Sequence, residues 1–221
     1  MRECDPPAAG GAADEDERPV WEPDVVEAFQ AFSDPEKATT EFEFMARTAM
    51  NLDFELGLRT GELVALQFSD RVGNVVKVRR ARSMIGGRKD IVEKKPKTGS
   101  GKRDVGMSSR AQALWDALPA RQSVPSIGGY LFVDEAGQPV HPSRIIAEFE
   151  RLRDGFLAEN PHVARITFRD VRSCAITRWV RRGVDAPMVK TMAGHKSYAF
   201  TIDRYFKATA ADTEAAAAKL G

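Results

Sequence analysis

Cysteine, histidine and long apolar runs are all scarce in this chain of 221 residues, and each scarcity excludes a class of protein. The only cysteines are Cys4, in a tail-like segment, and Cys174, in a helical pattern, so a disulfide framework is not expected. The three histidines are scattered without the spacing of metal ligands, so neither a metal nor another cofactor is predicted. No run approaches the roughly 18 apolar residues that a membrane span needs. Since a secretory signal is also lacking, we expect a cytoplasmic protein.

Net charge is only +1, but the charges are unevenly distributed along the chain. Residues 1–55 carry 4 Lys/Arg against 15 Asp/Glu, whereas residues 71–110 carry 13 against 3 and residues 144–207 carry 13 against 7. Basic stretches of this kind suit a polyanion such as nucleic acid. They are also typical of the solvated faces of ordinary proteins, so charge alone does not decide.

Periodicity predicts helices on both sides of a short β-rich region. Residues 1–19, rich in Pro, Gly, Ala and acids, are expected to be a disordered tail. Gly57 is expected to end one helix, Thr60 to cap the next and Ser143 to cap a later one. Helical patterns cover 23–32, 41–56, 61–66, 109–118, 142–159, 167–183, 187–194 and a last segment around Tyr205. Three β-leaning segments, 74–80, 88–94 and 102–107, suggest one antiparallel sheet and therefore an α+β fold.

Three stretches place side chains where they could act together on an anion. In ELGLRTGEL, Arg59 lies at a junction between two helices, beside backbone N–H groups. In FRDVRS, Arg169 and Arg172 are three residues apart, which places them on one helical face. Two adjacent guanidiniums repel each other unless an anion lies between them, and a phosphate accepts both. In AGHKSYAFTIDRYF, His195 follows a helix-ending glycine and Tyr205 lies ten residues further on.

In their order and spacing, these stretches resemble the boxes of the tyrosine recombinase, or phage integrase, family over about residues 20–210. LGLRTGEL resembles the first box, which implies a catalytic arginine at Arg59 and a supporting acid at Glu62. RDVRSCAI resembles the second arginine box and implies Arg172, and AGH implies His195. The spacing after this histidine implies that Tyr205 is the nucleophile.

Two of these assignments have rivals in the sequence. The family's catalytic lysine lies in a hairpin turn that resembles KPKTGSGKR, which implies Lys97, with Lys95 and Lys102 as close competitors. Tyr198 and Tyr130 compete with the proposed nucleophile, which only its spacing from the histidine favours.

One position departs from the family pattern. The residue three before the second arginine is usually histidine and can take the proton from the tyrosine, but here it is Arg169. An arginine stays protonated at neutral pH, so it can donate hydrogen bonds to a phosphate but cannot act as a base.

The resemblance implies a mostly helical catalytic domain over residues 20–210 with a small three-stranded antiparallel sheet at one edge. It implies site-specific cleavage and rejoining of double-stranded DNA through a 3′-phosphotyrosyl link, on a bacterial or phage element. Self-association as a tetramer on DNA is expected, with the Ala-rich tail at 211–221 docking on a neighbour. The family's N-terminal helical domain is not expected here, so DNA binding should be weaker than in a two-domain relative.

Two other functions remain open. The missing histidine is compatible with a recombinase-like module that binds DNA but cleaves it poorly. The same chemistry also serves type IB topoisomerases, which act as monomers and relax supercoiled DNA.

Overall fold

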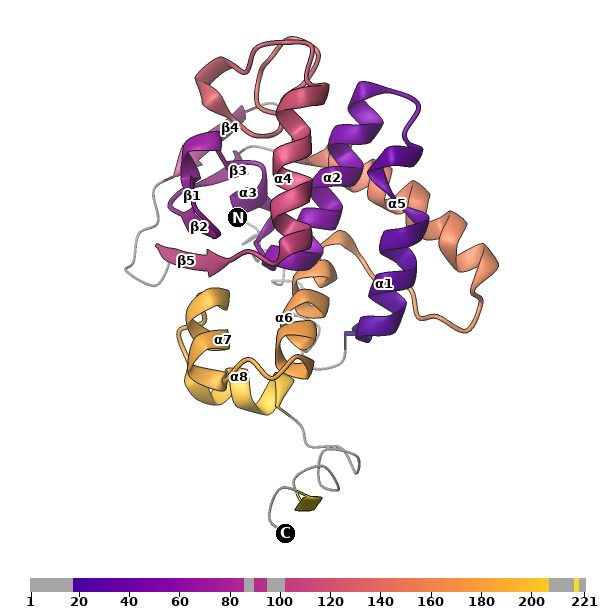
Figure 1. Cartoon of the computed structure of the whole chain (residues 1–221), viewed down its shortest axis with the longest axis vertical. Coiled ribbons are helices and arrows are strands. Elements are labelled where there is room, and N and C mark those ends of the chain that lie inside the picture. The colour runs from indigo at the N-terminus through magenta and orange to yellow at the C-terminus, as the bar shows by residue number, and fades with distance from the viewer. Residues whose placement is uncertain (1–17, 86–89, 95–101, 207–216, 219–221) are drawn as a thin grey trace, which may run out of the picture.

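A computed structural model describes residues 18–85, 90–94, 102–206 and 217–218. Helices surround the long central helix α2, the strands lie at one edge of the molecule, and α7 and α8 lie next to β5 and α6 (Figure 1). This is the mostly helical α+β fold with a small sheet that the sequence predicts. Lys97, most of the acidic tail and most of the Ala-rich tail lie outside the described residues. Among the described helices, none is long and apolar enough to cross a membrane.

The predicted helices are all present, with small corrections at their ends. Arg59, rather than Thr60, occupies the N-cap position of α3, and the His141 side chain, rather than Ser143, caps α5 by accepting a hydrogen bond from the backbone. The helices are α1 (Pro23–Phe32), α2 (Glu41–Leu56), α3 (Thr60–Leu63), α4 (Ser109–Arg121), α5 (Pro142–Glu159), α6 (Val171–Arg181), α7 (Ala186–Ala193) and α8 (Tyr198–Tyr205). Short 3-10 turns are η2 (Pro35–Lys37), η3 (Phe68–Asp70), η5 (Ile127–Gly129) and η6 (Phe168–Asp170).

The sheet has three antiparallel strands as expected, but one of its members differs from the prediction. Its order is β1-β2-β5, formed by β1 (Arg71–Val72), β2 (Val75–Val78) and β5 (Arg103–Gly106). The segment predicted at 88–94 contains β4 (Asp90–Lys94), which instead pairs with β3 (Ala81–Ile85) as a separate ribbon. A tight turn with Gly73 at a φ of 60° folds β1 back onto β2. A strand of two residues has no periodicity that a sequence pattern could reveal.

The core is built on α2, which is buried along nearly its whole length. An aromatic cluster joins it to the helices around it. The Trp21 ring is stacked against Phe54 at 6.3 Å between centroids, and Phe29 meets Phe156 edge-on at 5.4 Å. The first helix and the long α5 are thereby held against α2.

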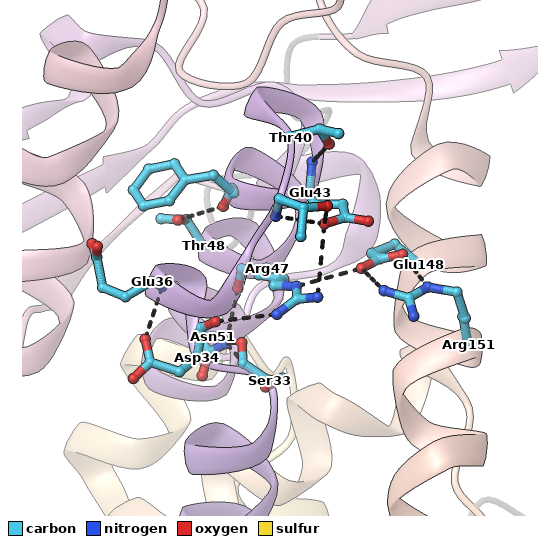
Figure 2. A network of polar contacts seen from close by, with 12 residues as sticks. Ser33, Asp34, Glu36, Thr40, Glu43, Arg47, Thr48, Asn51, Glu148 and Arg151 are labelled. Atoms are coloured by element: carbon cyan, nitrogen blue, oxygen red, sulfur yellow. Dashed lines mark hydrogen bonds and ion pairs between the residues drawn. The ribbon is translucent and has the colours of Figure 1, made fainter.

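A polar network fixes the N-terminal half of α2 to α5 (Figure 2). Arg47 is buried and forms ion pairs with Glu148 at 3.6 Å and with Glu43 at 3.9 Å. Glu148 also binds Arg151 through both carboxylate oxygens, at 2.8 and 2.7 Å. Because α2 is anchored to α5 here, its C-terminal end, which leads to Arg59, is held in a fixed position.

Candidate active site

The junction between α2 and α3 holds the first two residues of the site. Gly57 adopts a left-handed conformation with a φ of 55° and ends α2, and the chain then turns into α3. Glu62 is buried and accepts hydrogen bonds from the backbone N–H of Arg59 at 2.8 Å and from its guanidinium at 2.9 Å. The Arg59 side chain is nevertheless 52% exposed, so its remaining donors face solvent.

A buried arginine that the sequence reasoning did not single out completes this junction. Arg103, on β5, donates both terminal nitrogens to the two carboxylate oxygens of Glu62, at 2.9 and 2.8 Å. Its Nε donates to the carbonyl of Met192 at 2.6 Å. The sequence does hold one indication of this burial, because Arg103 is two residues before the apolar Val105 and so lies on the same, buried face of β5.

Arg172, on α6, connects the same junction to the end of α7. Its guanidinium donates to the carbonyl of Gly57 at 2.7 Å and also to the carbonyl of Ala193. Burial lowers the pKa of Arg172 to about 10, and the nearby positive charges of Arg59 and Arg103 add to this effect. The group stays protonated at neutral pH, but it is held among like charges.

His195 follows the end of α7, where Gly194 is left-handed with a φ of 67°. Burial lowers the pKa of His195 to about 4, with Arg172 and Arg59 lowering it further, so the ring is neutral at pH 7. Its Nδ1 lies 3.0 Å from the hydroxyl of Thr201, which itself donates to a backbone carbonyl. If the single proton of this hydroxyl is donated to that carbonyl, Nδ1 carries the ring proton and Nε2 can accept one.

Tyr205 lies against this histidine. The two rings are nearly parallel, at 13°, with centroids 5.9 Å apart. The phenol oxygen is 3.4 Å from the Ser173 hydroxyl and accepts a hydrogen bond from Arg204 Nε at 3.3 Å. Of its rivals, Tyr198 is 47% exposed at the start of α8, and Tyr130 lies beyond η5, where Arg82 covers its ring.

The remaining predicted site residues are not part of this buried cluster. Lys97 and Lys95 lie outside the described residues, and Lys102 is exposed just before β5. Arg169 is exposed on η6, a 3-10 turn that leads directly into α6 at Val171.

Asp53 is a second site residue that the sequence reasoning missed. Its carboxylate is almost fully buried and accepts a hydrogen bond from the backbone N–H of Leu58 at 2.9 Å, just before Arg59. Burial raises the pKa of Asp53 to about 7, although the Leu58 hydrogen bond and the charge of Arg172 oppose the rise. No sequence motif marks it, because it lies within an ordinary helical pattern.

The cluster as a whole combines guanidiniums, a neutral imidazole and a phenol. Among the described residues, no group of three or more His, Cys, Asp or Glu side chains is arranged to hold a metal ion. Fixed cationic donors beside a phenol can bind a phosphate and stabilise negative charge that develops on it.

Residues 20–212 match the model of the phage integrase family. The chain belongs to this family. Its fold is similar to that of the Tn1549 transposon integrase, solved with a circular intermediate DNA, with a TM-score of 0.76 and 21% identity over 94% of this chain and 67% of that one. XerH recombinase bound to difH has a TM-score of 0.66 and 15% identity, over 90% and 51% of the two chains. Among proteins with curated descriptions, none matches this sequence.

A third similar integrase fold is that of lambda integrase, solved as a dimer bound to a core site. Its TM-score is 0.56 with 15% identity, over 85% of this chain and 48% of that one. At such identities the likeness concerns the fold, and the chemistry must be argued from this chain's own residues.

Proposed function

We propose that this phage integrase family member is a site-specific DNA recombinase that cleaves and rejoins strands through a covalent bond to Tyr205. The observation that carries the proposal is the packing of a tyrosine against a neutral histidine, beside two arginines that share one junction. In the first step the phenol oxygen attacks phosphorus, a P–O bond forms, and the bond to the 5′-oxygen breaks. The phosphotyrosine conserves the energy of the phosphodiester, so rejoining needs no ATP.

The arginines act on the charge of the transition state. A phosphodiester under attack becomes more anionic, and donors that are already fixed around it stabilise that state more than the ground state. Arg59 has exposed donors, and Arg172 uses one hydrogen bond on each of two carbonyls, so both retain N–H groups for a phosphate. Lys97, by the family resemblance, would protonate the departing 5′-oxygen.

The phenol proton needs an acceptor other than position 169. Arg169 cannot serve at neutral pH. His195 is neutral there, and its ring lies alongside that of Tyr205. We infer that His195 takes the phenol proton, directly or through a water, and then donates a hydrogen bond to the phosphate as an imidazolium.

Double-stranded DNA is the partner that follows from this proposal, and recombination requires several protomers to meet on DNA. Whether the product is integration, excision or resolution depends on the DNA sites rather than on this cluster.

A second candidate is a DNA-binding module with weak cleavage, because Arg169 replaces the base that the family pattern expects. A nicked suicide substrate separates the two functions, because cleavage then traps the covalent complex. We expect the wild type to form an adduct that denaturing gels detect. Binding without any adduct would instead favour the module.

Tyr205→Phe should abolish the adduct while changing DNA affinity less than about threefold, because only the nucleophilic oxygen is lost. The matched control is Tyr198→Phe, which removes an exposed phenol seven residues earlier on the same helix. We expect the control to cleave normally. Adducts that persist in Tyr205→Phe and disappear in Tyr198→Phe would transfer the nucleophile role to Tyr198.

A further inference from the structure

We propose that Arg103 is a positioning residue that fixes Arg59 and His195 relative to each other, through Glu62 on one side and the end of α7 on the other. The inference rests on the proposed function. Arg103 cannot contact a phosphate itself, since its side chain is only 2% exposed. It must therefore act through the groups to which it is bound.

The first of these groups is Glu62, both of whose carboxylate oxygens accept hydrogen bonds. It accepts two hydrogen bonds from Arg103 and two from Arg59. Burial alone would raise the pKa of Glu62, but the hydrogen bonds and charge of Arg103 outweigh burial and hold it at about 2. The carboxylate is thus charged at neutral pH, and its paired contact with Arg103 sets the orientation in which it holds Arg59.

The second group is the C-terminal end of α7, which precedes His195. The last four carbonyls of a helix have no partner inside the helix. Here the carbonyls of Lys190 and Thr191 accept from backbone N–H groups beyond the helix, that of Met192 accepts from Arg103, and that of Ala193 accepts from Arg172. Arg103 and Arg172 therefore satisfy the last two carbonyls of α7, at the negative end of the helix dipole, where positive charge is favourable.

These contacts place Arg103 at the meeting point of three elements. β5 supplies it, α3 supplies its carboxylate partner, and α7 supplies its carbonyl partner. Only a guanidinium can make this set of bonds, because one fork of N–H groups satisfies two carboxylate oxygens while Nε reaches a third acceptor. A lysine keeps the charge but cannot make all three contacts.

The test compares Arg103→Lys with Arg178→Lys. Arg178 is the matched control because it is equally buried and ion-paired, with Glu55, but lies further along α6 from the cluster. We expect Arg103→Lys to lower the single-turnover cleavage rate at saturating DNA by roughly 10- to 100-fold, as misplaced catalytic groups do. DNA affinity should change less than about threefold, and Arg178→Lys should cleave at nearly the wild-type rate. Equal rate losses in both variants, or none in Arg103→Lys, would overturn the proposal.

A second readout needs no cleavage, so it separates this proposal from the proposed function. The pKa of His195 can be followed by proton NMR of its ring. In Arg103→Lys we expect it to rise from about 4 toward the ordinary value of about 6.5, because the end of α7 loosens and the ring gains solvent. An unchanged value would overturn the positioning role even if the wild type never forms an adduct.

If Arg103→Lys does not fold, the double variant Glu62→Met with Arg103→Met replaces the buried ion pair by apolar groups, a change that proteins often tolerate. This variant should fold, bind DNA and still lose cleavage, because Arg59 has lost its anchor. Wild-type cleavage by the folded double variant would contradict the proposal.

Discussion

At the scale of single residues, Asp53 shows how the site places an acid where it is hard to ionise. Its carboxylate accepts the N–H of Leu58 and so holds the turn that leads into Arg59. Burial raises its pKa to about 7 from an ordinary value of 3.8. The charge of Arg172 lies near enough to favour ionisation, yet it does not cancel the effect of burial.

Asp53→Asn should therefore change stability in a pH-dependent way. Between pH 4 and pH 7 the unfolded wild type releases a proton that the folded protein keeps, so its stability falls as pH rises through this window. Asparagine can still accept the Leu58 hydrogen bond and does not titrate. The free energy of unfolding of Asp53→Asn relative to the wild type should thus increase from pH 4 to pH 8, by up to about 4 kcal/mol.

Urea unfolding of both proteins across this range measures the difference. Asp104→Asn is the control for loss of one carboxylate, since Asp104 is exposed on β5. Parallel stability curves for wild type and Asp53→Asn would mean that the carboxylate ionises normally in the folded state.

The residues that the sequence identified are those whose position is defined locally. Arg59 follows a helix end and His195 follows a left-handed glycine, and both signals lie within a few residues. Arg103 and Glu62 are 41 residues apart, and their ion pair exists only because β5 packs beside the α2–α3 junction. No local pattern reports such a contact.

At the scale of secondary structure elements, Gly61 sets the distance between α3 and the ribbon of β3 and β4. A Cβ atom at this position would lie 2.4 Å from the backbone carbonyl oxygen of Arg82, on β3. No real Cβ atom tolerates such a contact, and a backbone atom cannot rotate away as a side chain can. Gly61 is therefore required by packing rather than by its backbone angles.

Gly61→Ala should push the ribbon away from α3 and lower the free energy of unfolding by about 1–3 kcal/mol, as overpacking does. The ribbon also leads in sequence toward Lys97, so cleavage should fall as well. Gly106→Ala is the control, because Gly106 has an ordinary φ and open space around its Cβ position. Thermal unfolding and single-turnover cleavage report both effects. If the two alanine variants are equally stable, the close approach to Arg82 does not matter in solution.

Element boundaries were predictable where caps and glycines mark them, and strand membership was not. Predicted and observed limits coincide for α1 and α2, whose ends carry a proline and a left-handed glycine. The segment 88–94 has the composition of a strand, but composition does not encode its pairing with β3 rather than with β2 or β5.

At the scale of the whole molecule, the chain keeps the integrase fold with little sequence identity to its structural relatives. The likeness to the Tn1549 integrase spans 94% of this chain at 21% identity. Apolar periodicity and the positions of chain reversals are enough to define such a fold. This explains why the architecture was predictable while contacts between distant segments, such as the partners of Arg103, were not.

The uneven distribution of basic residues leads to a prediction for the intact protein. DNA affinity of the Tyr205→Phe variant should fall about tenfold or more between 50 and 200 mM salt, because each neutralised phosphate releases a counterion. Fluorescence anisotropy with a labelled duplex measures this dependence without covalent trapping. An affinity that does not vary with salt would mean that the basic stretches do not face the DNA backbone.

The crowding of Arg59, Arg103 and Arg172 has a consequence for how this protein can evolve. Each positive charge disfavours its neighbours, and this repulsion adds to the effect of burial in lowering the pKa of Arg172. A docked phosphate would relieve that repulsion and tighten the protein. Under the proposed function, a lineage that stopped cutting DNA could remove this repulsion by replacing Arg172, but it would also lose the hydrogen bonds that Arg172 donates to the carbonyls of Gly57 and Ala193. The persistence of Arg172 in a descendant would therefore reflect folding as well as chemistry.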